Sequence, residues 1–306
     1  MRIVRYEACG ELRLGVCVKD DVIDITNLGR KSLRSFLDLA LEASEKDVSI
    51  DEFVNGIINE SSIDPPIYSY EDLENGKDDM RLVMPLDPPE VWGCGVTYRK
   101  SQEARESDTG VKGVYSLVYD APRPEIFFKG TAHRCVGPGE EICIRGDSSL
   151  NAPEPELAFI LGTKQEIIGF TAANDVSSRD IEGENPLYLP QAKIYEGCCA
   201  LGPAVVTVDE VGTEPKLRIE CRILRSGEVI FEGSVNTSQM KRSFEDLRYY
   251  LCLYNPVPFG SVCMTGTGIV PPEDLSLEEG DIVEISIEKI GTLRNHVRRL
   301  RPILKR

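Results

Sequence analysis

The sequence contains no run of apolar residues long enough to form a transmembrane helix. Its first fifteen residues, MRIVRYEACGELRLG, lack the apolar core of a secretory signal peptide. Basic residues are in the minority, because 35 lysines and arginines stand against 51 acidic residues and the formal net charge is −16. A protein of that charge repels nucleic acid and anionic membranes. We therefore expect a cytoplasmic protein that binds neither of them.

Histidine is scarce, and no two cysteines have CxxC spacing. His133 and His296 are the two histidines of the chain, which has ten cysteines. The closest pair, Cys198 and Cys199, is adjacent, and this spacing suits neither zinc ligation nor an ordinary disulfide. In a reducing cytoplasm, cysteines mostly serve as small buried side chains. We expect that role here.

The 306 residues are enough for one large domain and a smaller one. Residues 1–80 predict a small α+β domain, with three short strands followed by helices at 32–43, behind a Ser32 cap, and at 50–59. The polar stretch 61–79, rich in proline, glycine and acidic residues, predicts a linker that reaches to about residue 84.

From residue 85 to residue 306 the pattern is that of a β-rich catalytic domain. Short apolar runs punctuated by glycine and proline occur at 124–130, 156–162, 166–175, 203–211, 216–235 and 281–291. A long helix is expected at 239–254 and a shorter one near 99–107. Many strands with few helices favour an α+β, mostly β protein built as a barrel or rolled sandwich.

Two glutamates raise the first question about function. In NAPEPELAFILG, Glu154 and Glu156 are two residues apart, so in a strand they share one face. Adjacent carboxylates repel each other, and burial adds to the cost, so a divalent cation between them would relieve both penalties. Asp175, at the end of a second apolar run, offers a third oxygen ligand, and an all-oxygen set favours Mg²⁺ or Mn²⁺. From spacing alone, a solvent-facing acidic edge is an equally good interpretation.

A resemblance decides between these interpretations. The stretches EPELAFILG, GFTAANDVSSRD, KIYEGCCALGP and TGTGIVPP, in this order, resemble the motifs of the fumarylacetoacetate hydrolase family over residues 85–300. The resemblance implies a mixed β-roll or sandwich whose divalent metal is held by a Glu-x-Glu pair and a downstream Asp. Those positions are Glu154, Glu156 and Asp175. It also implies a homodimer or homotetramer.

Further stretches resemble one branch of this family, the 2-dehydro-3-deoxy-D-pentonate dehydratases. They are DPPEVWGCGVTY, YDAPRPEIFFKGTAHRCVGPGE, ENPLYLPQAKIYEGCCALGP and FEGSVNT. The resemblance implies that Glu125 and Lys193 are the acid–base residues, although without it Lys193 would be taken for a surface lysine and Glu125 for the start of a strand. Lys129 and Thr267 could hold the substrate carboxylate. Arg179 is expected to brace the metal loop through a carboxylate.

The hydrolases of the family resemble one another in a lid whose His–Glu pair activates water. Here GVTYRKSQEARE occupies the lid, and Ser101 stands where the histidine would be. A hydrolytic water therefore lacks its usual base, unless Glu103 or Glu106 replaces it. Dehydration needs no such water, because a 2-keto acid can chelate Mg²⁺ while one group takes a carbon 3 proton and another protonates the hydroxyl leaving carbon 4.

The expected reaction is thus Mg²⁺-dependent dehydration of 2-dehydro-3-deoxy-D-pentonate to 2,5-dioxopentanoate, with Mn²⁺ as a possible substitute. The alternatives are acylpyruvate hydrolysis, decarboxylation of a 2-keto diacid, and a catalytically silent, metal-stabilised binding protein. A mechanism through a Schiff-base lysine is disfavoured, because it would make the three carboxylates unnecessary. A silent protein is disfavoured because loss of function should have removed at least one member of the complete set, which is Glu125, Glu154, Glu156, Asp175 and Lys193. The arabinonate and xylonate derivatives are the same compound, so the sequence does not identify the parent sugar.

Overall fold

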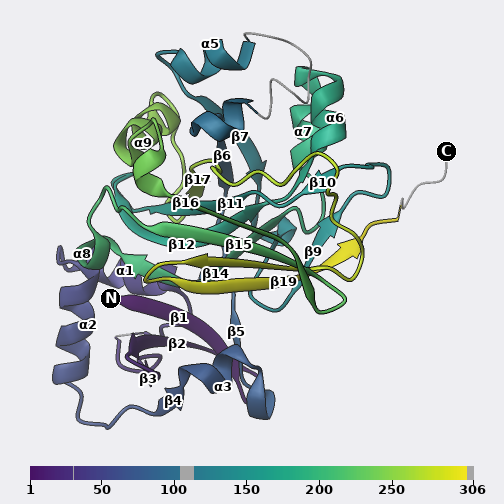
Figure 1. Cartoon of the computed structure of the whole chain (residues 1–306). Helices are drawn as coiled ribbons and strands as arrows, with labels where there is room; N and C mark the ends of the chain where they lie inside the picture. Colours follow the sequence, from purple (N-terminus) through teal and green to yellow (C-terminus); the bar gives the residue numbers. More distant parts are fainter. Residues whose placement is uncertain (30, 104–113, 302–306) are drawn as a thin grey trace.

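The computed structural model describes residues 1–29, 31–103 and 114–301. Strands form most of its regular structure, and the helices are short (Figure 1). Within these ranges, no helix has both the length and the apolar character needed to cross a membrane. The expected α+β, mostly β class is confirmed.

A twelve-stranded mixed sheet runs through the whole molecule. Its main path has the order β4-β3-β2-β1-β14-β12-β11-β17-β6-β7, with β5 paired to β1 and β8 paired to β14. The strands are β1 (Arg2–Ala8), β2 (Glu11–Val18), β3 (Asp21–Asp24), β4 (Ile67–Ser69), β5 (Arg81–Val83), β6 (Val91–Gly95), β7 (Glu125–Gly130), β8 (Cys135–Val136), β11 (Pro155–Leu161), β12 (Ile167–Asp175), β14 (Cys199–Thr207) and β17 (Val262–Met264).

A five-stranded sheet packs against the middle of the large one. Its order is β16-β15-β18-β19-β9, and β10 pairs with β13 as a separate two-stranded ladder. These strands are β9 (Glu141–Ile144), β10 (Asn151–Ala152), β13 (Ser177–Ser178), β15 (Arg218–Arg225), β16 (Glu228–Asn236), β18 (Ile282–Ile287) and β19 (Gly291–Arg299). Phe159 and Phe170 of the large sheet share one core with Ile223, Ile285 and Leu293 of the small one. The alternating apolar runs seen in the sequence meet in this layer.

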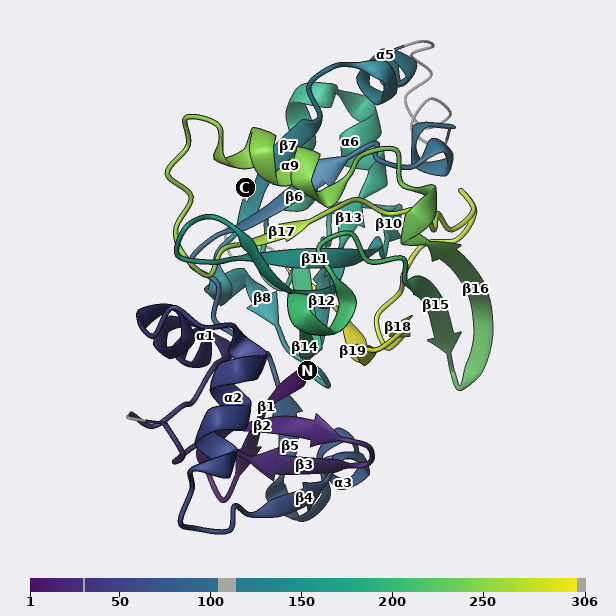
Figure 2. The ribbon, with the colours of Figure 1, turned by 90° about the vertical axis from the view of Figure 1, so that its left-hand side faces the viewer.

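Helices cover the other face of the large sheet and its upper end. Leu39 of α1 (Phe36–Glu45) and Phe53 of α2 (Ile50–Asn59) form a second core with Ile160 and Val205 of the large sheet (Figure 2). The remaining helices are α3 (Tyr70–Glu74), α5 (Val114–Asp120), α6 (Arg179–Glu184), α7 (Leu189–Lys193), α8 (Val208–Val211) and α9 (Phe244–Cys252), with 3₁₀ turns at Lys77–Asp79, Ala132–Arg134, Pro186–Tyr188 and Thr237–Gln239. β11 is therefore covered on both faces.

Local hydrogen bonds explain where two expected helices begin. The cap of α1 is Ser35 rather than Ser32, because the Ser35 side chain accepts from the backbone of Leu37 and Asp38, and the Asp38 side chain accepts in return from Ser35. The expected helix at 239–254 is shorter, since Ser243 caps α9. The helix expected near 99–107 begins at residue 99, and its part beyond residue 103 lies outside the described residues.

The expected linker at 61–79 is wrong. This stretch contains β4, which pairs with β3 through Ile23 and Ile67, and α3, whose Leu73 is fully buried. The N-terminal unit also shares the large sheet with the rest of the chain, because β1 pairs with β14 from Arg2 to Val4. The domain boundary near residue 84 stays a prediction, while the hydrogen-bonded sheet is continuous across it.

Candidate metal centre and active site

The site lies where β11 begins and β12 ends. The two strands are antiparallel neighbours, with Pro155 opposite Asn174 and Glu156 opposite Ala173. This register brings the start of one strand beside the end of the other, although the residues are almost twenty positions apart in sequence. The Asp175 backbone N–H donates to the Glu154 carbonyl over 2.9 Å. The pairing of two apolar strands therefore brings the acidic motif and the downstream aspartate together.

Glu154, Glu156 and Asp175 form one acidic group, as the sequence predicted. Each offers a carboxylate oxygen, and these atoms all lie within 4.8 Å of one another. Glu156 and Asp175 are each only 1% exposed, whereas Glu154 is half-buried at the open side. The solvent-facing acidic edge that spacing alone allowed is thus wrong. Three converging, mostly buried carboxylates are a donor set suited to a hard divalent cation.

Lys193 is buried against this group. It is the last residue of α7 and is 0% exposed. Its Nζ contacts Glu154 Oε2 at 2.8 Å and Asp175 Oδ2 at 3.0 Å, and it donates to Ser177 Oγ at 2.5 Å. An ammonium group has three N–H donors, so these contacts use all of them. The interpretation of Lys193 as a surface lysine is therefore excluded.

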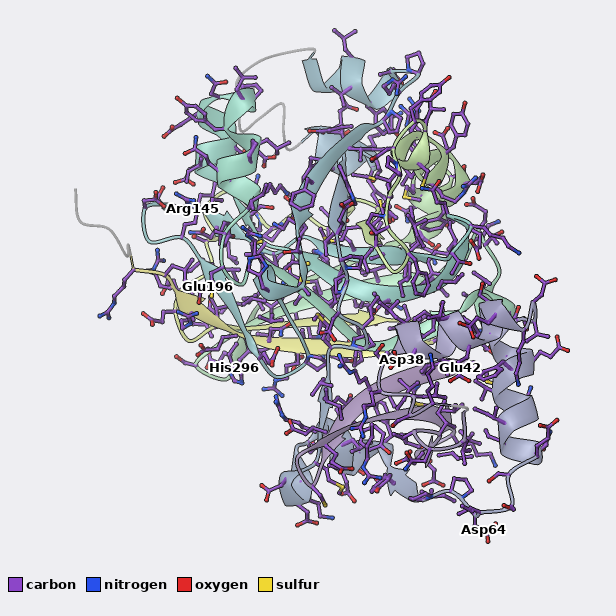
Figure 3. All side chains as sticks on the ribbon, turned by 180° about the vertical axis from the view of Figure 1, so that it is seen from behind. Asp38, Glu42, Asp64, Arg145, Glu196 and His296 are labelled. Atoms are coloured by element: carbon purple, nitrogen blue, oxygen red, sulfur yellow. The ribbon has the colours of Figure 1, made fainter. Side chains whose placement is uncertain are left out.

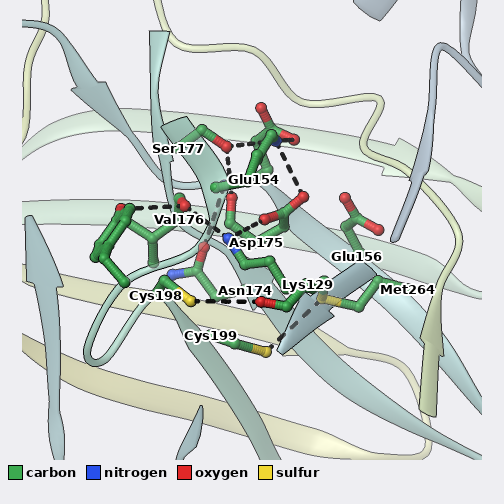
Figure 4. Close-up of polar contacts among 12 residues, drawn as sticks. Lys129, Glu154, Glu156, Asn174, Asp175, Val176, Ser177, Cys198, Cys199 and Met264 are labelled. Atoms are coloured by element: carbon green, nitrogen blue, oxygen red, sulfur yellow. Dashed lines mark hydrogen bonds and ion pairs between the residues drawn. The ribbon is translucent and has the colours of Figure 1, made fainter. Parts of the chain in front are cut away.

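Lys129 approaches Asp175 from the other side. It lies on β7 and is 0% exposed, and its Nζ is 2.5 Å from Asp175 Oδ1 and donates to the Val176 carbonyl over 2.9 Å (Figure 4). Asp175 therefore has a lysine at each carboxylate oxygen. The expected contact of Lys129 with the substrate carboxylate stays a prediction, and the contact seen here is with a metal-ligand candidate.

Charges in the site shift the pKa values of its groups in opposite directions. Burial alone would raise the pKa of Asp175, but the positive charges of Lys129 and Lys193 outweigh it and hold that pKa below its usual value. Burial, and then the negative charges of Asp175 and Glu154, raise the pKa of Glu156 well above its usual value. Two lysines thus do not fully offset three carboxylates.

Backbone and amide groups hold the glutamates in place. The Gly266 N–H donates to Glu156 Oε2 over 2.6 Å, and the Glu154 N–H donates to Asn174 Oδ1 over 3.1 Å. Gly266 belongs to the turn after β17, a strand that pairs with β11 through Ala158 and Met264. The glycine-rich turn TGTG therefore binds a metal-ligand candidate through its backbone.

Glu125 begins β7, as the structural interpretation expected, and its side chain is on the same face of this strand as Lys129. Residues 125, 127 and 129 alternate along this strand and share one face. Lys129 contacts Asp175 from that face, and the Phe127 ring centroid is 5.6 Å from Lys193 Nζ. Oε2 of Glu125 is buried and has no hydrogen-bond partner among the described residues. A carboxylate oxygen of this kind is available to a substrate hydroxyl or a proton.

A small cavity opens beside Glu154. Ser101, Arg179 and Thr267 line it together with this glutamate and with Glu182. Thr267 Oγ1 bonds within its own turn, to the backbone of Ile269. Hydroxyl groups therefore face the open side of the acidic group, and contact of Thr267 with the substrate carboxylate stays a prediction.

Arg179 donates to the Pro271 carbonyl over 3.1 Å. Its expected brace through a carboxylate stays a prediction. Of the two glutamates considered as substitute bases, Glu103 is exposed and Glu106 lies outside the described residues. That either of them replaces the lid histidine stays a prediction.

The histidines and cysteines take no part in the acidic group. His133 is exposed in the turn after β7, and His296, labelled in Figure 3, is exposed on β19, which lies between β18 and β9 in the small sheet. All ten cysteines are free thiols. Cys198 and Cys199 lie below the site, and burial raises the pKa of the Cys198 thiol (Figure 4). The metal-ligand candidates are therefore carboxylates alone.

Sequence reasoning missed three contributors. Ser177 accepts from Lys193, the Gly266 N–H holds Glu156, and the Tyr195 hydroxyl donates to the Val176 carbonyl over 3.2 Å. Each lies inside a motif that was already recognised, so the motif was the available signal. Its spacing does not show which of its residues face the carboxylates.

Comparison with known proteins identifies the family. The family model for the fumarylacetoacetate (FAA) hydrolase C-terminal region matches residues 90–298. Over 230 residues, the chain is 52% identical to 2-dehydro-3-deoxy-D-arabinonate dehydratase of Saccharolobus solfataricus, covering 74% of this chain and 77% of that protein. Over 288 residues, it is 44% identical to the probable 2-keto-3-deoxyxylonate dehydratase of Haloferax volcanii, covering 94% of this chain and 96% of that protein.

A solved structure is similar over nearly the whole chain. It is 2-keto-3-deoxy-D-arabinonate dehydratase complexed with magnesium and 2,5-dioxopentanoate, with 40% sequence identity and a TM-score of 0.83, and the match covers 99% of this chain and 100% of that one. The expected resemblance and fold are confirmed. This chain belongs to the fumarylacetoacetate hydrolase family.

Proposed function

We propose that this protein dehydrates 2-dehydro-3-deoxy-D-pentonate to 2,5-dioxopentanoate with Mg²⁺, and that it is a hydro-lyase of pentose breakdown. The observation that carries the proposal is a buried lysine, Lys193, held against three converging carboxylates. Two relatives with 52% and 44% identity are named dehydratases of this substrate class. A structure of 40% identity is named as a complex of such an enzyme with magnesium and this product.

The residues present fit a divalent cation. Glu154, Glu156 and Asp175 carry three negative charges when all are ionised, and Lys129 and Lys193 carry two positive charges, so the carboxylates of this buried group outnumber its lysines. A divalent cation would offset this excess. Burial of a charge that has no partner is costly, so the excess of carboxylates favours a bound cation.

The three carboxylates would hold the ion. When bound, Mg²⁺ supplies positive charge for the negative charge that develops on the keto oxygen as a carbon 3 proton leaves. The chain's own groups do the rest. Gly266 and Asn174 fix the two glutamates, and Lys129 keeps Asp175 ionised and in place. A ligand set of this kind is organised before the substrate arrives.

Glu125 and Lys193 divide the proton transfers. One accepts the carbon 3 proton, and the other donates a proton to the hydroxyl that leaves carbon 4 as water. Glu125 has a buried oxygen with no hydrogen-bond partner among the residues that the structure describes, and Lys193 donates to three acceptor atoms. A proton then moves from carbon 5 to carbon 3, and the resulting enol at carbon 5 becomes the aldehyde. The sum is loss of one water, with no change in oxidation state overall.

Ser101 distinguishes this reaction from hydrolysis. It is 7% exposed and lines the cavity beside Glu154, where it offers a hydroxyl rather than an imidazole. A hydroxyl group is a poorer base for water than an imidazole. Acylpyruvate hydrolysis and 2-keto diacid decarboxylation remain the alternative reactions, and a metal-stabilised binding protein is the alternative without catalysis.

One incubation separates these functions. Purified protein with Mg²⁺ is given 2-dehydro-3-deoxy-D-pentonate, an acylpyruvate or a 2-keto diacid, and the aldehyde product is followed with a coupled aldehyde dehydrogenase. We expect aldehyde from the first substrate and essentially intact acylpyruvate. Rapid acylpyruvate cleavage without aldehyde would promote the hydrolase, and no turnover of any substrate would favour the binding protein.

Two variants test the acid–base pair. Glu125→Gln and Lys193→Met should each lower kcat by about a hundredfold or more, because each removes a group that transfers a proton. Mg²⁺ binding should persist in Glu125→Gln, since Glu125 is not among the ligand candidates. Lys164→Met is the matched control for the lysine variant, because Lys164 is 75% exposed and pairs with exposed Asp47. A fully active Glu125→Gln or Lys193→Met enzyme would contradict the assignment.

The protein is further proposed to be a cytoplasmic homodimer or homotetramer. Ten free thiols support a reducing compartment. The family resemblance supports self-association, and so do Leu187 and Tyr188, which are exposed side by side at 83% and 39%. Light scattering of the purified protein gives the mass in solution, and a monomeric mass would contradict the assembly.

A further inference from the structure

Two glycines of β6 face the two side chains that wall the site. Gly93 lies opposite Phe127 and Gly95 lies opposite Glu125 in the antiparallel pair of β6 and β7. Residues directly opposite in such a pair project to the same face of the sheet. Trp92, which precedes Gly93 and lies opposite Phe128, projects to the other face, where the two rings pack edge to face with centroids 5.5 Å apart. The site face of β6 therefore has no side chains at these two positions.

The missing side chains leave room that Phe127 and Glu125 occupy. A Cβ atom at Gly95 would lie 2.0 Å from Glu125 Oε2 and 2.6 Å from its Cδ, and a Cβ at Gly93 would lie 2.4 Å from the Phe127 ring. Neither glycine has a positive φ, so backbone conformation does not demand glycine at these positions. The remaining reason for glycine at these positions is the close approach of the Phe127 and Glu125 side chains, because glycine inside a strand often marks such an approach.

Glu125 and Phe127 lie on the face of β7 that carries Lys129. Glu125 folds back across β6 with Oε2 buried and without a hydrogen-bond partner in the described part of the chain. Phe127 lies against Lys193, with its ring centroid 5.6 Å from Nζ. Lys129 continues the same face of β7 and contacts Asp175. Gly95 thus sets the position of Glu125, one acid–base candidate, and Gly93 sets the position of the Phe127 ring beside Lys193, the other candidate.

We propose that Gly95 is a positioning residue for the reaction, because its lack of a side chain seats the Glu125 carboxylate against β6, and that Gly93 does the same for Phe127 beneath Lys193. The proposal rests on the proposed function, since it assigns Glu125 a part in proton transfer. It gives the WGCG segment a role that neither backbone geometry nor the apolar core explains.

The nature of the clash makes Gly95→Ala informative. The atoms that a new Cβ would meet are the far end of a flexible glutamate, not backbone, so the fold can accommodate the methyl group by moving the carboxylate. In an ordinary strand position, replacing glycine by alanine is neutral or slightly stabilising because it restricts the unfolded chain. Gly95→Ala should therefore fold normally and misplace Glu125.

Kinetics measure this displacement. We expect Gly95→Ala to lower kcat by about tenfold or more, because proton transfer depends on hydrogen-bond reach. Its Mg²⁺ affinity, measured by calorimetry, should stay within about twofold, since the metal-ligand candidates come from other strands. Gly130→Ala is the matched control: Gly130 lies on the same β6–β7 ladder, but its added Cβ would meet only Arg134, at 3.4 Å or more. Its kcat should be unchanged.

A double variant ties the effect to Glu125. In a Glu125→Gln background, Gly95→Ala should cause little further loss, because the displaced group is already inactive. Full activity of Gly95→Ala would overturn the proposal, and so would a loss that adds in full to that of Glu125→Gln. A crystal structure of Gly95→Ala should show the carboxylate moved away from β6, and an unmoved carboxylate would also overturn it.

If Gly95→Ala misfolds, a second variant tests whether the clash with Glu125 is the cause. Glu125→Ala removes the obstructing carboxylate, so the Gly95→Ala/Glu125→Ala protein should recover the thermal midpoint of Glu125→Ala alone. If it does not, Gly95 serves the backbone and the proposal fails. The proposed function fails separately, when Glu125→Gln itself keeps full activity. The two failures therefore have different signatures.

Discussion

Replacement of Lys129 by methionine tests how the site holds its charges. Lys129 is 0% exposed, and Asp175, its partner over 2.5 Å, has a side chain that is 2% exposed. Methionine keeps most of the aliphatic length and removes the ammonium group. The variant therefore leaves the packing of β7 largely intact and takes one positive charge away from a buried carboxylate.

The loss of stability in Lys129→Met depends on the contacts that remain around Asp175. Removing one partner of a buried ion pair typically destabilises a protein by about 3–5 kcal/mol, because the other charge stays buried. Here Lys193 still contacts Asp175 Oδ2 at 3.0 Å, and the Tyr195 hydroxyl still donates to the Val176 carbonyl that Lys129 also serves. The loss should thus lie at the lower end, about 3 kcal/mol. In a chain of this size, that lowers the thermal midpoint by roughly 5–10 °C.

Urea unfolding with and without Mg²⁺ is the assay, and the single tryptophan, Trp92, is a fluorescent reporter. A cation at the acidic group would give Asp175 the charge that Lys129 no longer supplies, so saturating Mg²⁺ should stabilise Lys129→Met more than it stabilises the parent protein. Lys164→Met is the control, because its exposed pair contributes at most about 1 kcal/mol.

Two results would refute this reasoning. One is a Lys129→Met protein as stable as Lys164→Met, which would mean that the buried pair contributes nothing net. The other is a stability difference between Lys129→Met and the parent that Mg²⁺ leaves unchanged, which would mean that no cation binds next to Asp175.

Three further predictions concern the same site. Glu154→Gln should weaken Mg²⁺ binding by about tenfold or more in calorimetry, because an amide oxygen is a poorer ligand for a hard cation, and unchanged affinity would remove Glu154 from the ligand set. Chelation with EDTA should abolish aldehyde formation and added Mg²⁺ or Mn²⁺ should restore it, so full activity in excess chelator would contradict a metal-dependent reaction. Ser101→Ala should change kcat by less than about threefold, and a loss as large as that of Glu125→Gln would give this hydroxyl a part in catalysis.

Strands with a strong local signal could be predicted from the sequence. β11 and β12 are apolar runs ended by charged or turn residues, and the expected β-rich run at residues 216–235 forms two paired strands, β15 and β16. The stretch 61–79 was misjudged, because proline and acidic residues there favour a loop locally. Its pairing with β3 and the burial of Leu73 come from tertiary contacts, which override weak local preferences.

The carboxylates could be predicted because strand geometry places residues two apart on one face. Their buried setting could not, since a buried acidic pair has the same spacing as an exposed one. The partners of Lys129 depend on β7 lying beside the end of β12, and those residues are more than forty positions apart. Contacts of that range leave no trace in the local pattern. The close approach of Glu125 to Gly95 of β6 could not be predicted either, because these residues are far apart in the sequence.

The seam between β1 and β14 has a consequence for how this chain is made. One edge of β1 is divided, since Arg5 to Glu7 pair with β5 and Arg2 to Val4 pair with β14. Val4 meets Ala204, so its partner is synthesised two hundred residues later. Until then, the first half of that edge has unpaired backbone groups, and such an edge can recruit a foreign strand. The N-terminal unit can therefore complete its sheet only after most of the chain has left the ribosome.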